Sequence, residues 1–416
     1  MMDAVDVAPS TACPAPAARA AAAVTAAALP AAALLLPWLR APARVREHEE
    51  ASEGHATPLK PRCVAFDNAK FLVQVLVIWD HVLAISGFSF EGGPYSAVTK
   101  AVRFHMPLAC LLSGAVSRGA LTKDRLLAML VSNISAGLIS PNSWYVKCLT
   151  AWRLLSRMLS VLPVLLQWTV VLLLGISSAY SKKELHEMDR VASMLPYFFL
   201  GQQLDWDRLC HWRERLCGRR LCISWIVFLG FVGYYILFEQ QVDVAVRAVD
   251  TYFPALPWTS MLTMLSPECP EERPYLAARY CAGLVLRGAQ ALLFFLFCVP
   301  HGPSPFSELG AHSVYSFLLH PLPLLAINLP LAIWLRSLEV ELWYWRYEQV
   351  DGELVVIPPA LDVRLKGCAW ALAHLPYSLA VAWLLSTPRC RAKCSWLVEP
   401  WWVVCRRRAR DEAKDS

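Results

Sequence analysis

The chain has 416 residues, of which 56% are hydrophobic and only 17% are charged, and its formal net charge is +6. Soluble domains carry about 25% charged residues, so this composition excludes a chain of several soluble domains. No basic patch is interleaved with aromatic residues, which excludes the usual pattern of nucleic-acid binding.

Residues 1–60 differ from the rest of the chain, since they are rich in alanine and proline and then in charged residues. An apolar stretch at 20–39 allows two interpretations, a signal or transit segment and a low-complexity tail. Asp3 and Asp6 precede this stretch, where a signal peptide would carry basic residues. The composition therefore favours a low-complexity, Ala/Pro-rich cytosolic extension over 1–60.

From Asp67 onward, the sequence contains a series of apolar runs near the length of about 20 residues that a bilayer requires. The expected fold class is all-α, a polytopic membrane helical bundle of about ten transmembrane helices within residues 61–386. A basic cytosolic tail at 387–416 follows it. The expected spans are 69–88, 100–118, 124–140, 144–160, 161–180, 191–204, 221–238, 277–299, 313–335 and 368–386.

The charges between these runs predict their orientation. Arginines cluster at 208–220 and at 406–408, and basic residues close to a membrane mark its cytosolic side. The acidic segment 239–272 is expected on the opposite side. The sequence therefore predicts a multi-pass integral membrane protein with both termini in the cytosol, in an endomembrane or in the plasma membrane.

His81 lies near the end of the first apolar run, and ionisable side chains inside a membrane tend to mark a function. Asp67 and Asn68 are expected to cap the helix, and Lys70 follows them at the membrane edge. Eleven residues separate Lys70 from His81, which places both on nearly the same helix face, about 16 Å apart along the axis. Such a face suits an anionic carrier with a long thin arm. Alternatively, Lys70 only extends to the membrane surface and His81 only bonds a neighbouring helix.

Two further histidines lie in or beside apolar runs. His105 precedes Pro107 at the start of the second run, and His320 precedes Pro321 in the ninth. Cys390 and Cys394 have a spacing found among metal ligands, but no second pair or histidine motif accompanies them. The sequence therefore predicts no metal site.

Five groups of residues occur in a fixed order between about Val64 and Trp334. They are Phe66 to Lys70 with His81, Arg103 to Leu108 with Leu112 to Gly114, Ser143 to Tyr145 with Trp152 and Arg153, Leu195 to Gly201, and Leu309 to Tyr315 with His320 and Pro321. Together they resemble the motifs of the acyltransferase 3 family of membrane O-acyltransferases, and most closely those of its sugar O-acetyltransferase-like members. Asp80 departs from this pattern, since the family usually has glycine there.

The resemblance implies an enzyme that takes an acyl group, most often acetyl, from cytosolic acyl-coenzyme A. It implies transfer to a hydroxyl of a carbohydrate or glycolipid acceptor, with no metal ion involved. The expected partners are the lipid bilayer, acyl-coenzyme A and this acceptor. The expected roles are catalysis by His81 and His105, coenzyme binding by Lys70 and Arg153, and acceptor binding by Trp144, Tyr145 and His320.

Two other classes of protein remain open at this point. A multi-spanning transporter would use intramembrane histidines as a proton relay. An inactive acyltransferase-like scaffold would account for Asp80 at the position where the family has glycine.

Overall fold

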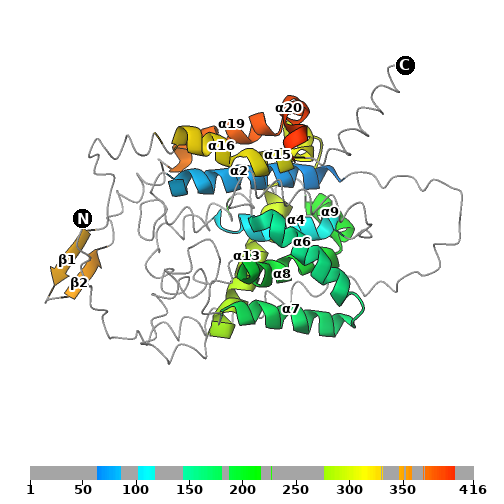
Figure 1. Cartoon of the computed structure of the whole chain (residues 1–416). Coiled ribbons are helices and arrows are strands. Elements are labelled where there is room, and N and C mark those ends of the chain that lie inside the picture. The colour runs from blue at the N-terminus through cyan, green and yellow to red at the C-terminus, as the bar shows by residue number, and fades with distance from the viewer. Residues whose placement is uncertain are drawn as a thin grey trace, which may run out of the picture.

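The computed structural model describes residues 63–85, 102–117, 144–179, 187–216, 226, 276–328, 330, 346–350, 353–357, 369 and 371–398. The predicted extension at 1–60 and span at 124–140 lie outside these residues, as does the span at 221–238 apart from residue 226. The described part is predominantly helical, as expected (Figure 1). Among the described residues, no helix is both long enough and apolar enough to cross a membrane.

Helices lie over most of the predicted spans, with ends that differ from the predicted ones by up to seven residues. Those that do so are α2 (Val64–Ile85), α4 (His105–Val116), α6 (Trp144–Leu159), α7 (Val164–Ala179), α8 (Glu187–Gln203), α13 (Leu276–Phe297) and α19 (Leu375–Leu385). Helix α2 begins at Val64, so Asp67 and Asn68 lie inside its first turns, and the predicted capping role is wrong. The Asp67 carboxylate instead lies near the positive end of the helix dipole.

The segment predicted as one helix over 313–335 is broken. It forms α15 (Ser313–Leu319), α16 (Pro321–Pro323) and the π-helix η4 (Leu324–Asn328). Pro321 and Pro323 have no backbone N–H, so the regular hydrogen-bonding pattern of an α-helix cannot continue through them. His320 lies at this junction.

Some elements form where only loops or a tail were expected. Helix α9 (Trp206–Leu216) lies in the arginine-rich segment, and α14 (Pro305–Ala311) precedes α15. Helix α20 (Pro388–Val398) begins the basic tail. A two-stranded antiparallel hairpin, β1 (Arg346–Val350) and β2 (Glu353–Ile357), was also missed.

Helix α2 is the central element, because it packs on two sides (Figure 1). One stripe of apolar residues, including Ala69 and Val73, joins the large core that contains α4 and α8. A second stripe, spaced by three or four residues, packs against α14, η4 and α19 and consists of Phe71, Val75, Ile78 and Val82. A helix that is apolar on both sides is buried between two layers, and α2 lies between α19 and α4.

Glycines of the sequence motifs lie where helices cross. A Cβ atom at Gly114 of α4 would overlap the backbone of Phe198 in α8, and one at Gly201 of α8 would overlap the backbone of Leu111 in α4. A Cβ at Gly310 of α14 would overlap the carbonyl group of Asp67. These glycines allow the backbones to approach closely, as small residues do between packed helices.

Candidate functional site

Three histidines that are far apart in the sequence gather at one place in the bundle. The ring of His81 on α2 lies 5.0 Å from the ring of His320, centroid to centroid. His105, at the start of α4, interacts electrostatically with His81. His105 and His320 are buried and His81 is exposed, so His81 is the member that an entering molecule would reach.

Backbone carbonyl groups determine which ring nitrogen of each histidine carries a proton. His81 Nδ1 lies 2.7 Å from the Val77 oxygen, His105 Nδ1 lies 2.8 Å from the Val102 oxygen, and His320 Nδ1 lies 2.7 Å from the Phe317 oxygen. A carbonyl oxygen only accepts hydrogen bonds, so each Nδ1 must be the donor. In the neutral rings, Nε2 then carries the lone pair. The exposed His81 therefore offers a basic nitrogen from a fixed ring.

Asp80 is close enough to the histidine cluster to interact with it electrostatically. Its carboxylate interacts electrostatically with His105 on α4. Adjacent helical residues point about 100° apart, so Asp80 and His81 leave α2 in different directions. The residue that departs from the family pattern thus adds a negative charge beside the second histidine.

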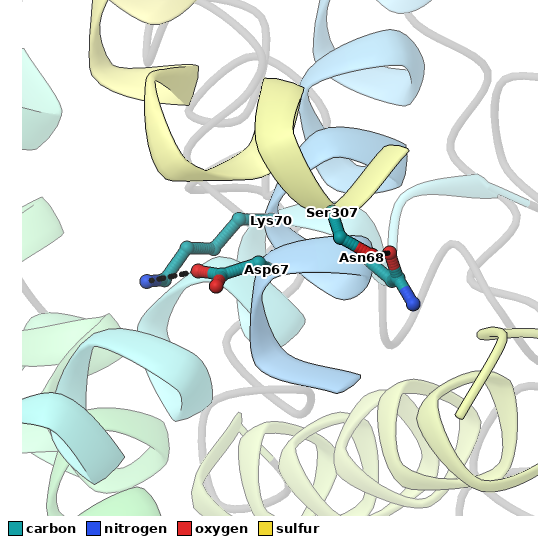
Figure 2. Close-up of polar contacts among 4 residues, drawn as sticks. All are labelled: Asp67, Asn68, Lys70 and Ser307. Carbon is teal, nitrogen blue, oxygen red and sulfur yellow. Dashed lines mark hydrogen bonds and ion pairs between the residues drawn. The ribbon is translucent and has the colours of Figure 1, made fainter. Parts of the chain in front are cut away.

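Lys70 lies at the other end of α2 and is paired with an acid (Figure 2). Its Nζ is 3.3 Å from Asp67 Oδ1, and the Lys70 side chain is 32% exposed against 5% for Asp67. The buried carboxylate holds the ammonium group at the surface of the helix, where an anion can compete for it.

Gln74 lies between Lys70 and His81 on the same face of α2 and was not singled out from the sequence. Its side chain is 9% exposed. Its Oε1 is buried and has no hydrogen-bond partner. A buried amide oxygen without a partner is costly, which makes Gln74 a candidate ligand-binding residue. The sequence feature that could have indicated Gln74 is its position one helical turn after Lys70, as a polar residue within an apolar run.

On another side of α2, Asn68 connects the helix to α14, as Figure 2 shows for Ser307, and to the loop before α14. Its Nδ2 donates to the Pro300 and Gly302 oxygens at 2.9 and 3.1 Å. Its Oδ1 accepts from the Ser304 and Ser307 hydroxyls, both at 2.7 Å. Asn68 is fully buried, so this motif residue fixes the start of α2.

Arg153 lies toward the Lys70 end of the bundle. Its Nε donates to Ser117 Oγ at 2.8 Å, just beyond the end of α4. One turn later, Ser156 accepts a hydrogen bond from Gln202, near the end of α8, at 3.2 Å. Trp206 follows α8 and packs on Phe66 at the start of α2, with ring centroids 5.0 Å apart. The two predicted coenzyme-binding cations thus lie toward the same end of α2.

Trp144 and Tyr145, the aromatic residues predicted to bind the acceptor, both contact other side chains of the bundle. The Tyr145 hydroxyl donates to the Ala109 oxygen at 2.9 Å and lies 2.8 Å from Ser113 Oγ. Its ring is 5.0 Å from that of Phe317, whose ring is 6.1 Å from that of His320. The Trp144 ring lies 5.1 Å from the Arg190 guanidinium. Tyr145 is thus connected to the histidine cluster through Phe317, while Trp144 faces Arg190.

His301 lies in the loop before α14 that the Asn68 side chain holds. Burial and the nearby positive charge of Arg213 lower the pKa of His301 to about 4. Its ring is therefore neutral at physiological pH and leaves no positive charge in this loop.

No family model matches this chain, and no curated protein or solved structure matches it.

Proposed function

We propose that this protein is an integral-membrane O-acyltransferase that moves an acyl group, most simply acetyl, from acyl-coenzyme A to a hydroxyl of a carbohydrate or glycolipid. The observation that carries this proposal is the histidine cluster. His81 presents an accessible basic Nε2. Its position on α2 lies about 16 Å along the helix axis from that of Lys70, on the same helix face. The order of the five motif groups, which resembles the acyltransferase 3 family, supports the same reaction class.

The distribution of polar and apolar side chains supports placement in a membrane. Large apolar side chains are exposed on α7, η4 and α19, among them Leu165, Leu173, Leu325, Ile327 and Trp383. Fully buried polar residues include Asn68, Arg287, Ser316 and Ser378. Extended apolar surface marks contact with a partner or a membrane. We propose lipid tails as the covering partner, in a bundle of about ten transmembrane helices with both termini in the cytosol.

In the proposed reaction, His81 Nε2 removes the proton from the acceptor hydroxyl. The hydroxyl oxygen attacks the thioester carbonyl carbon, the carbon–sulfur bond breaks, and the coenzyme leaves as a thiolate that takes up a proton. His105 and His320 hold the site around His81. Positioned proton transfer of this kind contributes about 10²–10⁴-fold to a rate.

The remaining residues bind the two substrates in this proposal. Lys70 and Arg153 contact the coenzyme phosphates, Lys70 by exchanging Asp67 for a phosphate oxygen. The Gln74 amide bonds the amide groups of the long coenzyme arm on its way to His81. Tyr145 shapes the acceptor side through Phe317 and His320. Trp144 lies at the edge of the acceptor site in this proposal, where its ring faces the Arg190 guanidinium.

The decisive experiment incubates the purified protein with acetyl-coenzyme A and carbohydrate acceptors, and follows free coenzyme thiol and acetylated product. Consumption of the thioester with acetylation supports the enzyme. The histidine cluster is also what a proton-coupled transporter would need. Substrate-driven uptake in liposomes without thioester consumption would favour that function, and neither result would favour an inactive scaffold.

Lys70→Ala is expected to weaken acetyl-coenzyme A binding by about 10–100-fold, because a hydrogen bond to a charged group contributes about 1.5–3 kcal/mol. Lys70→Arg should retain most of the affinity, since the charge survives. Titration calorimetry measures this, with Lys393→Ala on α20 as a control for the loss of one cation. Equal affinity in wild type and Lys70→Ala would remove Lys70 from the site.

Gln74→Leu is expected to raise stability and lower coenzyme affinity together. The substitution removes a buried amide oxygen without a partner, whose cost is about 1–3 kcal/mol. It also removes the group that we assign to the coenzyme arm. The matched control is Gln167→Leu, which should be destabilising because Gln167 Nε2 donates to the Leu162 oxygen at 2.7 Å. Unchanged affinity in a stabilised Gln74→Leu protein would contradict the assignment.

The proposed orientation predicts the accessibility of tags. Tags at the C-terminus and near residue 212 should both be accessible from the cytosol, and a tag near residue 250 should be protected in sealed vesicles. Protease digestion of oriented vesicles checks this result. A protected C-terminus would overturn the orientation.

A further inference from the structure

The broken helical segment that follows His320 ends in a buried amide. Asn328 is the last residue of the π-helix η4, and its side chain is only 7% exposed. Among the described residues, its Oδ1 has no hydrogen-bond partner. A buried amide oxygen without a partner is costly for a folded protein, and a bound molecule that supplies the partner removes this cost.

The burial pattern shows which face of this segment carries Asn328. His320, Leu324 and Asn328 follow one another at intervals of four residues, and all three are buried. Leu324 belongs to the cluster that packs on the apolar stripe of α2 containing Ile78 and Val82. The residues that alternate with them are about half exposed, namely Leu322, Leu325 and Ile327. Asn328 therefore shares with His320 the face that is turned inward.

The π-helix contributes to this shared face. Over eight residues, a regular α-helix would rotate Asn328 about 80° away from the direction of His320. The hydrogen bonds of a π-helix join residues five apart instead of four, so each residue of its wider turn rotates the chain by less. This smaller rotation brings Asn328 back toward the direction of His320. Single π-helical turns of this kind are frequently found at functional sites.

Asn328 lies beyond the histidine cluster, on the side away from the start of α2. A Cβ at Gly310 would overlap the Asp67 carbonyl group, and the His320 ring lies 5.0 Å from the His81 ring. The chain from α14 to α15 therefore runs along α2 in the direction of α2 itself, and η4 continues past His320 (Figure 1). Eight helical residues place Asn328 about 12 Å further along this path than His320.

We propose that Asn328 binds a second sugar ring of the acceptor, while the ring that receives the acyl group lies at His81. An amide both donates and accepts hydrogen bonds, as the hydroxyl groups of a sugar do. A path of about 12 Å is longer than a single sugar ring. The acceptor that reaches both residues is therefore an oligosaccharide or glycolipid with at least two rings. This inference rests on the proposed acyl transfer and narrows its acceptor.

The experiment compares methyl β-glucoside with methyl β-maltoside as acceptors of acetyl groups from acetyl-coenzyme A. The full-length protein is purified in a detergent without sugar groups, and both acetylated glycoside and free coenzyme thiol are measured. We expect the wild type to prefer the disaccharide. Asn328→Leu should lower kcat/KM for the disaccharide by about 2–10-fold, the effect of one lost neutral hydrogen bond, and leave the value for the monosaccharide unchanged.

The outcomes separate the second-ring site from the acyl transfer on which it rests. An equal loss for both glycosides, no loss in Asn328→Leu, or a wild type without preference would overturn the second-ring site. Thioester consumption without acetylation of either glycoside would also overturn it. A wild type that does not consume the thioester would refute the acyl transfer itself. Gln74→Leu is the control for a lost buried amide, since it should weaken coenzyme binding and keep the preference for the disaccharide.

A stability measurement tests the Asn328 amide independently of any activity. Asn328→Leu should raise the thermal unfolding temperature, because an apolar group replaces an amide oxygen without a partner. Asn68→Leu is the matched control and should lower this temperature, since it removes the hydrogen bonds to Pro300, Gly302, Ser304 and Ser307. A lower unfolding temperature for Asn328→Leu would mean that its amide is already satisfied by the protein, and would overturn the proposal.

Discussion

His81→Ala is expected to lower the rate of acyl transfer by about two to four orders of magnitude, the usual contribution of a positioned general base. The structure strengthens this expectation, since His81 is the exposed member of the cluster and its Nδ1 is bonded to the Val77 oxygen. The lone pair on Nε2 is therefore free to take a proton. Single-turnover transfer from acetyl-coenzyme A to an acceptor measures the effect.

We expect His81→Ala to leave the fold intact, because it removes an exposed ring from a helix without leaving a buried group unpaired. Coenzyme affinity and thermal unfolding should therefore match those of the wild type. His211→Ala on α9 is the control for loss of a histidine outside the cluster. Wild-type turnover in a folded His81→Ala protein would mean that His105 or His320 is the catalytic base instead. If His81 is the base, alanine substitution of His105 or His320 should lower the transfer rate by less than His81→Ala does.

Gly201→Ala is expected to lower the free energy of unfolding by about 3 kcal/mol or more, at or beyond the upper end of typical overpacking costs. In the interior of an ordinary helix, replacing glycine with alanine stabilises by about 0.5–1 kcal/mol. The sign reverses here because a Cβ would overlap the Leu111 backbone of α4, which cannot rotate away. The two helices would have to separate.

Gly302→Ala is the matched control, because a Cβ at Gly302 has no atom within 4 Å. It should stay within about 0.5 kcal/mol of the wild type, as typical surface substitutions do. Gly114 faces the same crossing from α4, so the double variant Gly114→Ala, Gly201→Ala should cost less than the sum of the single variants. Denaturant or thermal unfolding in detergent measures the wild type, the three single variants and the double variant, and full additivity would contradict a shared crossing.

The sequence determined the type of structure and several of its elements. Apolar runs of helical length predicted helices that appear over 144–159, 164–179 and 276–297, among others. The spacing of Lys70 and His81 on a regular helix fixed their common face, because helical geometry needs no tertiary information. The sequence also drew attention to His105 and His320, since ionisable residues in apolar runs are rare.

Tertiary structure alone decided what these residues contact. His81 meets His320 and interacts with His105 only because α15 and α4 pack on either side of α2, and no periodicity in the sequence encodes that pairing. The same holds for Asp80, which interacts electrostatically with His105 on α4.

The features that the sequence did not predict also have specific physical causes. Helix α9 was missed because its arginines indicated a loop, although an amphipathic helix can carry such charges on its exposed face. The break at Pro321 and Pro323 was missed because the apolar run continues through it. The motif glycines were visible as letters, but only the crossing of α4 and α8 shows why a side chain has no room there. Local composition and helical spacing follow directly from the sequence, whereas contacts between distant helices depend on how the whole bundle packs.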